Sequence, residues 1–163
     1  MPTSEPTTSE PSTAEPSTAN LTGADPKAPM RVALPNKGAL SEEAAELMSE
    51  AGYRLGRSGK ALRVYDRDES VEFLFLRPRD IAIYVGSGVI DLGITGRDLS
   101  SDSQAPVDEV LSLGFGKAEF RLAAPAGSGF ALVDGARIAT SYDGLLGAYL
   151  TKQRVEASII HLD

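Results

Sequence analysis

The chain has 163 residues, 16 Lys and Arg against 23 Asp and Glu, no Cys, no Trp and one His, and its formal net charge is −7. This length is about that of one domain and is enough to bury a core. Without Cys there is no disulfide, thiolate metal site or Cys nucleophile, and a single His excludes a metal site built from several His.

The charge balance and the apolar pattern also narrow the classes of partner. An acidic chain lacks the basic stripe that is typical of a nucleic-acid binder. No apolar run reaches the ~18 residues that a membrane-spanning helix needs, and no cationic segment followed by an apolar segment opens the chain as a secretory signal would. We therefore expect a soluble cytoplasmic protein, with neither nucleic acid nor a membrane as its partner.

Residues 1–29 differ in composition from the rest of the chain. They contain six of the ten Pro, within a five-residue near-repeat that starts at Glu5, Glu10 and Glu15. Such a tract has too little apolar surface to offset chain entropy, so we expect it to be a disordered tail. Met30 directly precedes the first strand-like run and is a candidate translation start; a linker that ends before it is the alternative.

From residue 31 the pattern predicts alternating strands and helices. Apolar residues at helical spacing predict an amphipathic helix that ends at Gly52, and two strands around an acidic turn predict a hairpin. Pro78 suits the first turn of a second helix, because its φ is already helical. The expected strands are 32–34, 62–65, 71–76, 92–94, 107–115, 120–124, 137–140 and 157–162, and the expected helices are 40–51, 79–86 and 145–153. This alternation predicts an α/β fold with a largely parallel sheet.

The sequence contains neither of two common nucleotide-binding motifs. It has no phosphate-binding loop of the G-x-x-x-x-G-K-[ST] type, and residues 86–91 lack the third Gly of the dinucleotide fingerprint. Charged strand-to-helix turns remain, at 36–38, 77–80 and 95–98. Each turn places a charged side chain beside backbone N–H groups at the carboxyl end of a strand, where anionic ligands are usually held.

Three stretches of sequence carry a resemblance to a known family. They are RVALPNKGAL at 31–40, FLRPRDIAIYV at 75–85 and DLGITGRD at 91–98. The motif R-P-x-D-I, followed by Y-V and then by D-x-G-I-x-G-x-D, resembles the ATP phosphoribosyltransferase family and is most similar to its long-form members. The similarity extends through 113–116, 124–126 and 137–140, and so covers nearly all of residues 30–163.

The resemblance implies an activity and an architecture. Members of this family join N1 of the adenine of ATP to the anomeric carbon of phosphoribosyl pyrophosphate (PRPP), with Mg²⁺ and with loss of pyrophosphate, in the first step of histidine biosynthesis. Their catalytic region has two lobes like those of type II periplasmic binding proteins, with the site between the lobes. We therefore expect lobe I over residues 30–119 and the start of lobe II over residues 120–163.

The chain also departs from the family pattern. The run that holds the PRPP phosphates, the return to the first lobe and the carboxyl-terminal regulatory domain have no counterpart in it. We therefore expect a fragment with a truncated second lobe that turns over no ATP alone and that forms a homo-oligomer when full length. A non-catalytic ligand-binding or regulatory module, and an inert truncation, are the alternative interpretations.

The resemblance also implies roles for residues in the three turns. Displacing pyrophosphate builds positive charge on the ribose and negative charge on the leaving group, so the site needs preorganised charge rather than a nucleophile. By family position, Lys37 and Arg77 are expected to contact phosphate or the leaving group, and Asp98 to orient a substrate hydroxyl or amine. Gly38 and Gly96 are expected to line the substrate site.

Each of these residues also has a structural interpretation. Lys37 could be a solvated surface lysine, and Asp98 could be the N-cap of a helix. Arg77 could form an ion pair with Asp80 or Glu72. We expect Tyr84 to pack rather than to stack on adenine and His161 to be structural.

Overall fold

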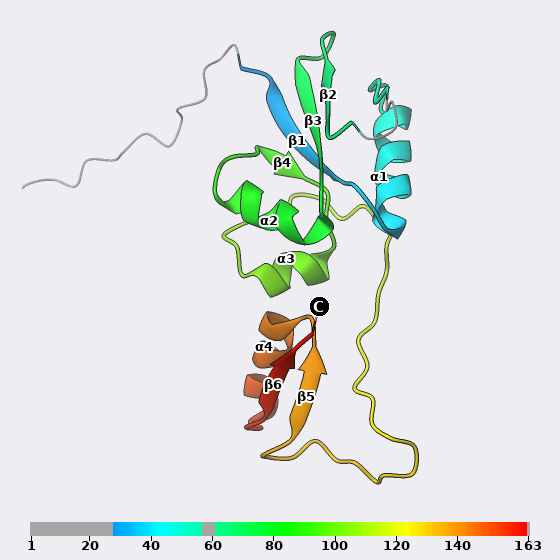
Figure 1. Cartoon of the computed structure of the whole chain (residues 1–163). Coiled ribbons are helices and arrows are strands. Elements are labelled where there is room, and N and C mark those ends of the chain that lie inside the picture. The colour runs from blue at the N-terminus through cyan, green and yellow to red at the C-terminus, as the bar shows by residue number, and fades with distance from the viewer. Residues whose placement is uncertain (1–27, 57–60, 163) are drawn as a thin grey trace, which may run out of the picture.

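The computed structural model describes residues 28–56 and 61–162. The prediction of disorder over residues 1–29 falls, except for the last two of them, outside the described residues. Within the described residues, the strands form a four-stranded sheet near the amino-terminal end and a two-stranded sheet near the carboxyl-terminal end (Figure 1).

The first sheet is built around a central parallel strand. Its strand order is β2-β3-β1-β4; β1 pairs in parallel with β3 and β4, and β2 pairs antiparallel with β3 as the predicted hairpin. Its strands are β1 (Met30–Pro35), β2 (Arg63–Asp66), β3 (Val71–Leu76) and β4 (Leu92–Gly93), and its helices are α1 (Ala39–Glu50), α2 (Pro78–Gly86) and α3 (Arg97–Ser103).

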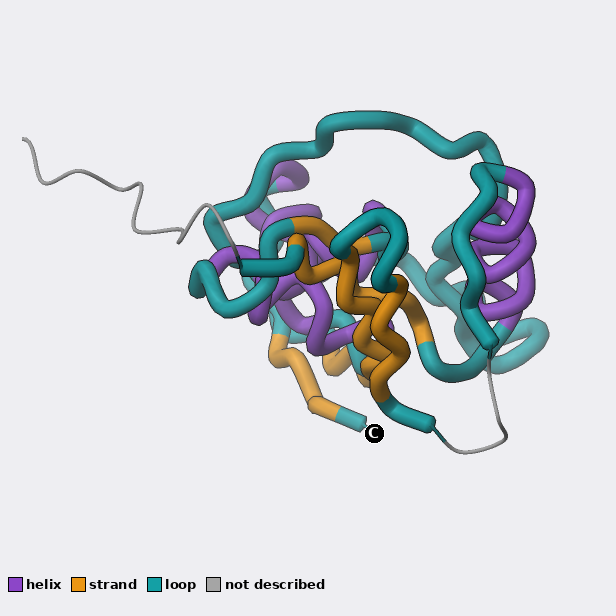
Figure 2. Tube along the Cα trace, turned by 90° about the horizontal axis from the view of Figure 1, so that it is seen from above, coloured by secondary structure: helices purple, strands orange, loops and turns teal. Residues whose placement is uncertain are grey.

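Both faces of this sheet are covered by helices, and each face has its own core. Because successive strand residues point to opposite faces, Leu34 and Phe73 pack with Ala44 of α1, whereas Ala33 packs with Ile81 of α2. Figure 2 shows the strands lying between helices on two sides. The run of buried residues in β1 and β3 is what a strand covered on both faces produces.

The acidic turn of the hairpin is held by one buried carboxylate. Asp66 ends β2 and accepts hydrogen bonds from the backbone N–H groups of Arg54 at 3.1 Å, Asp68 at 3.1 Å and Glu69 at 3.4 Å. The N–H of Arg54 contributes most to holding the pKa of Asp66 below its ordinary value. The turn is therefore a structural feature at the edge where β3 begins.

The second sheet has two parallel strands and one helix. Its elements are β5 (Arg137–Thr140), α4 (Asp143–Gln153) and β6 (Ser158–His161). Leu150 is the buried hydrophobic residue of this unit; within residues 28–56 and 61–162, every other buried hydrophobic residue lies between Val32 and Ile94. The second unit therefore has a much smaller core than the first.

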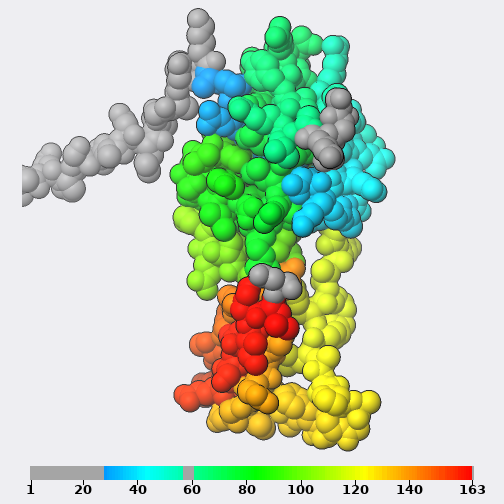
Figure 3. Space-filling view, in the orientation of Figure 1, coloured from blue at the N-terminus to red at the C-terminus, as the bar shows by residue number. Residues whose placement is uncertain are grey.

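The segment between the two sheets differs from the prediction. Strands were expected at 107–115 and 120–124, but the chain forms no strand in either range and is exposed along most of its length. Val110 is 80% exposed, and Figure 3 shows the segment as a yellow column along one side of the molecule. The apolar pattern was present, but a strand also needs a neighbour to pair with, and none of the described strands pairs with this segment.

The other expected elements are confirmed with ends that differ by at most two residues, and α3 is a helix that the sequence pattern did not predict. Three of the four strand pairings are parallel, so the α/β class with a largely parallel sheet is also confirmed. In the described part of the chain, the structure contains no helix with the length and apolar character needed to cross a membrane.

Candidate functional site

The three charged turns lie at one edge of the first sheet. The parallel strands β1, β3 and β4 end at Pro35, Leu76 and Gly93, and each leads into a helix: α1, α2 and α3 respectively. The two strands of the second sheet run toward this edge from the other side, so the carboxyl ends of both sheets face each other (Figure 1). This is the edge of an open α/β sheet at which ligands bind.

The first turn contains Lys37 and Gly38. Gly38 is the N-cap of α1, with φ 81° and ψ 178°, a conformation that is essentially restricted to glycine. The Lys37 side chain is exposed and makes no ion pair within the described ranges. The bend therefore requires Gly38, and it leaves the ammonium group of Lys37 available to a ligand.

The second turn places Arg77 at the start of α2. Arg77 is the N-cap, in the extended conformation that a following proline favours, and Pro78 begins the helix. The expected alternative was an ion pair with Asp80 or Glu72. Neither pair forms: Glu72 is held by Arg31 at 3.5 Å and by Arg63, and no ion pair joins Arg77 to any residue that the structure describes.

The third turn holds the carboxylate of Asp98 against the backbone. Gly96 is the N-cap of α3 and Asp98 lies in the first turn, with no side-chain capping bond, so Asp98 is not the N-cap that the alternative proposed. A Cβ at Gly96 would collide with Oδ1 of Asp98. Burial first, and then the charge of Asp98 together with hydrogen bonding to its carboxylate, raise the pKa of Tyr142 above its ordinary value.

The structure brings these residues to one edge, but it does not join them all. Gly96 and Asp98 are in contact, whereas no hydrogen bond or ion pair connects Lys37, Arg77 and Asp98 within the described residues. The two cations and the carboxylate thus stand on separate turns, as groups that contact different parts of one ligand would.

Three polar residues beside this edge were not among the site residues expected from the sequence: Arg79, Asp102 and Tyr142. Arg79 contacts both Asp102 and the ring of Tyr142. A signal for Tyr142 was available, because it follows the predicted strand at 137–140 just as the three turns follow theirs. Asp102 carried no such signal, since it lies in a helix that was not predicted.

The expected Mg²⁺ has no binding site built from protein groups among the described residues. No group of three or more His, Asp or Glu side chains is placed to hold a metal ion there. Asp98, the carboxylate of the candidate site, is already engaged by Tyr142. These described residues therefore do not fit a dedicated Mg²⁺ site.

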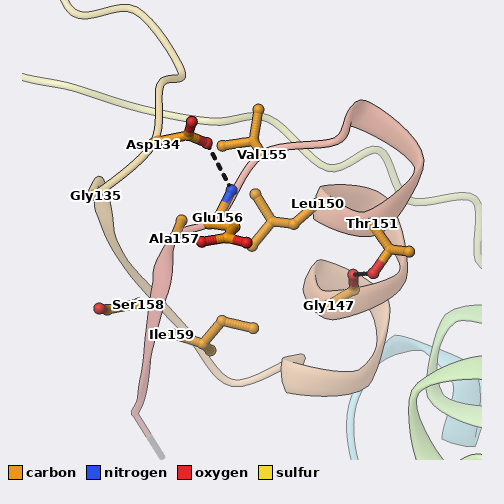
Figure 4. A pocket seen from close by; sticks show the side chains of 10 residues that line it. All are labelled: Asp134, Gly135, Gly147, Leu150, Thr151, Val155, Glu156, Ala157, Ser158 and Ile159. Carbon is orange, nitrogen blue, oxygen red and sulfur yellow. Dashed lines mark hydrogen bonds between the residues drawn. The ribbon is translucent and has the colours of Figure 1, made fainter.

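Two further features lie outside the turns. His161 Nδ1 is 2.8 Å from Oδ2 of Asp143, which ties the end of β6 to the start of α4, so the structural role expected for His161 fits its contact. A hollow of about 520 Å³ lies between α4 and the β5–β6 sheet, beside Leu150 and Thr151 (Figure 4). None of the residues expected in the site lines it.

The fold and the turns define an α/β protein whose exposed cations lie at the carboxyl ends of parallel strands, an arrangement suited to anionic ligands. The model of one family, described as ATP phosphoribosyltransferase, matches residues 77–163. The chain belongs to this family.

Individual relatives agree with this assignment. The ATP phosphoribosyltransferase of Rhodococcus erythropolis is 60% identical over 136 residues, which are 82% of this chain and 48% of the relative. That of Micrococcus luteus is 53% identical over 138 residues, 82% of this chain and 49% of the relative. The chain thus spans about half the length of these relatives.

A solved structure shares the fold. A chain of the ATP phosphoribosyl transferase (HisG:HisZ) complex from Thermotoga maritima matches with a TM-score of 0.62 at 22% identity. The match covers 82% of this chain and 64% of that chain. The likeness shows that the two chains share a fold.

Proposed function

We propose that this chain provides the amino-terminal part of an ATP phosphoribosyltransferase of the cytoplasm. The enzyme transfers the phosphoribosyl group of PRPP to N1 of the adenine of ATP and releases pyrophosphate, the first step of histidine biosynthesis. The observation that carries the proposal is the pair of exposed cations, Lys37 and Arg77, on adjacent strand-ending turns of a chain that belongs to this family.

In this proposal the two sheets are parts of two lobes. Residues 30–119 form lobe I and residues 120–163 begin lobe II, in the manner of type II periplasmic binding proteins, with the substrates between the lobes. The facing carboxyl ends of the two sheets support this division (Figure 1). Segments that the longer relatives have and this chain does not would complete lobe II and provide the phosphate loop for PRPP.

The roles of the turn residues follow from where charge develops. As the bond to pyrophosphate breaks, negative charge grows on the leaving group, and fixed cations stabilise it without needing to reorganise. Lys37 and Arg77 contact phosphate or the leaving group, and the bends at Gly38 and Gly96 bring the backbone close to the substrate. Asp98, held by Tyr142, orients a substrate hydroxyl or amine.

The proposed ligands and partners are consistent with these roles. Mg²⁺ would enter bound to the phosphates of the substrates, because phosphate oxygens are among the ligands that this ion commonly takes. We further propose that the full-length protein forms a homo-oligomer.

The test joins this chain to the carboxyl half of the Rhodococcus erythropolis relative. We expect the fusion protein to convert ATP to phosphoribosyl-ATP in a reaction that requires PRPP and Mg²⁺, and the 163-residue chain alone to give no turnover. A folded fusion protein that binds ATP or PRPP but produces no product would favour the non-catalytic binding module. Turnover by the 163-residue chain would contradict the need for the missing segments.

A further inference from the structure

The two sheets are joined by a cluster of polar contacts around Arg79, in addition to the long exposed segment. Nη1 of Arg79 lies 3.2 Å from Oδ2 of Asp102 in α3, and Nη2 donates a hydrogen bond of 2.5 Å to the backbone carbonyl of Ser141, just after β5. Its guanidinium also lies over the ring of Tyr142, 5.3 Å from the ring centre. One side chain of α2 therefore contacts both α3 and the second sheet's unit.

Asp102 connects α3 to α4 through its other oxygen. Oδ1 accepts a hydrogen bond of 3.0 Å from the backbone N–H of Leu145, in the first turn of α4. That N–H has no partner within its own helix, and α4 has no side-chain cap of its own. Asp102 acts as the missing cap from a different helix, and its side chain is only 8% exposed.

The backbones of α3 and α4 also touch directly at a glycine. A Cβ added at Gly144 would lie 2.5 Å from the carbonyl oxygen of Asp102, which is closer than real Cβ contacts. Gly147, one turn further along α4, has room, since a Cβ there would lie 3.9 Å from the side chain of Ile159. The chain thus offers a disruptive glycine substitution and a matched control on the same helix.

Tyr142 connects this junction to the candidate site. Its ring contacts the guanidinium of Arg79 and also meets the ring of Phe120 edge-on, with the ring centres 4.9 Å apart. Its hydroxyl group reaches Asp98. A shift of the second unit against α3 would therefore move the hydroxyl group that holds the Asp98 carboxylate.

We propose that Arg79 and Asp102 are positioning residues that fix the β5–α4–β6 unit against α3 and, through Tyr142, hold Asp98 in place at the facing strand ends. The role given to Asp98 rests on the proposed function, whereas the fixed placement of the two units does not. Removing Arg79 leaves the carboxylate of Asp102, which is 8% exposed, without its ion-pair partner, and this is unfavourable for a buried charge. Because the second unit has little core of its own, this junction is what sets its orientation.

The first experiment measures the placement of the two units in the 163-residue chain. The chain has no Cys, so a variant with Cys at both of the exposed positions Glu46 and Lys152 has two defined sites for spin labels. We expect a narrow distance distribution by electron–electron double resonance. Arg79→Gln and Gly144→Ala should each broaden or displace it, and Gly147→Ala should leave it unchanged.

The second experiment follows the capping bond and the contact with Asp98. We expect the amide of Leu145 to exchange its hydrogen roughly tenfold faster or more in Arg79→Gln and in Asp102→Ala, because its charged acceptor is displaced or removed. The ζ-carbon NMR signal of Tyr142 should shift in Arg79→Gln, and Arg79→Lys should restore part of that shift. Amides of β1 and β3 should keep their protection, which separates positioning from general unfolding.

An unchanged distance distribution in both Arg79→Gln and Gly144→Ala would overturn the proposal. So would a Tyr142 signal that Arg79→Gln does not move. Neither measurement depends on substrate or on turnover, so an inactive fusion protein would contradict the proposed function and leave this proposal standing.

Discussion

The two sheets are built from the same kinds of element but are stabilised in different ways. The four-stranded sheet has two apolar cores, one under α1 and one under α2. The two-stranded sheet has one buried hydrophobic residue, Leu150, and is held to the first by Arg79 and Asp102. Strand pairing alone does not make an independently stable unit, because a two-stranded pair needs an apolar face packed against something else.

This difference has a consequence for function. The turns that carry Lys37, Arg77 and Asp98 are anchored on the well-packed sheet, so their backbone positions are fixed by the core. The opposite side of the candidate site is placed by the polar contacts of Arg79 and Asp102 with Ser141 and Leu145. The first sheet therefore holds its charged turns on an apolar core, whereas the second unit is placed by a few polar contacts.

The largest expected effect is on the core of the first sheet. Phe73 is fully buried, and replacing a buried Phe by Ala costs about 3–5 kcal/mol. We expect Phe73→Ala to lower the free energy of unfolding by this amount in a urea titration followed by the amide signals of β1 and β3. Leu150→Ala is the matched change in the other unit, and it should leave those signals nearly unaffected; an equal loss in both variants would mean that the two units share one core.

A smaller effect is expected at the bend before α1. Gly38 has a backbone conformation that other residues reach only at a cost of about 1–3 kcal/mol. We expect Gly38→Ala to destabilise the first sheet by that amount in thermal unfolding. Gly147→Ala, at a helical position with space for a methyl group, is the control and should be neutral or stabilising by up to ~1 kcal/mol.

The smallest effect is the titration of Tyr142. The pKa of Tyr142 is raised by burial and then by Asp98. Its protonated hydroxyl group therefore contributes to stability fully at pH values below the ordinary pKa of tyrosine, and this contribution is lost as the pH rises through the raised pKa. In Asp98→Asn we expect the pKa of Tyr142 to fall toward 10.0, measured from the ζ-carbon signal against pH. A pKa that does not move would remove Asp98 as a partner of this hydroxyl group.

The sequence predicted much of the first sheet, because its signals are local. The apolar run of β1, the helical spacing in α1 and the position of Pro78 each define an element without reference to distant residues. The turns that hold Lys37, Arg77 and Asp98 were predicted for the same reason, since each follows a recognisable strand.

The rest depends on partners that the sequence does not reveal. Residues 107–124 have the apolar pattern of strands, yet no described strand pairs with them. Helix α3 was missed because it is only seven residues long and buries none of them. Arg79 and Ser141 are 62 positions apart in the sequence, so their contact follows from the packing of the two units and from no local pattern.

The most direct test of the account compares two arginines of the first sheet in the active fusion protein. Arg77 lies at the carboxyl edge, where we place the substrates, whereas Arg67 is exposed in the hairpin turn, where β3 begins. We predict that Arg77→Ala lowers kcat/KM by about 10²–10³, the effect of removing one preorganised charge-stabilising group, and that Arg67→Ala changes it by less than about twofold. Rate constants within about twofold of the parent for Arg77→Ala would contradict the placement of the site at this edge.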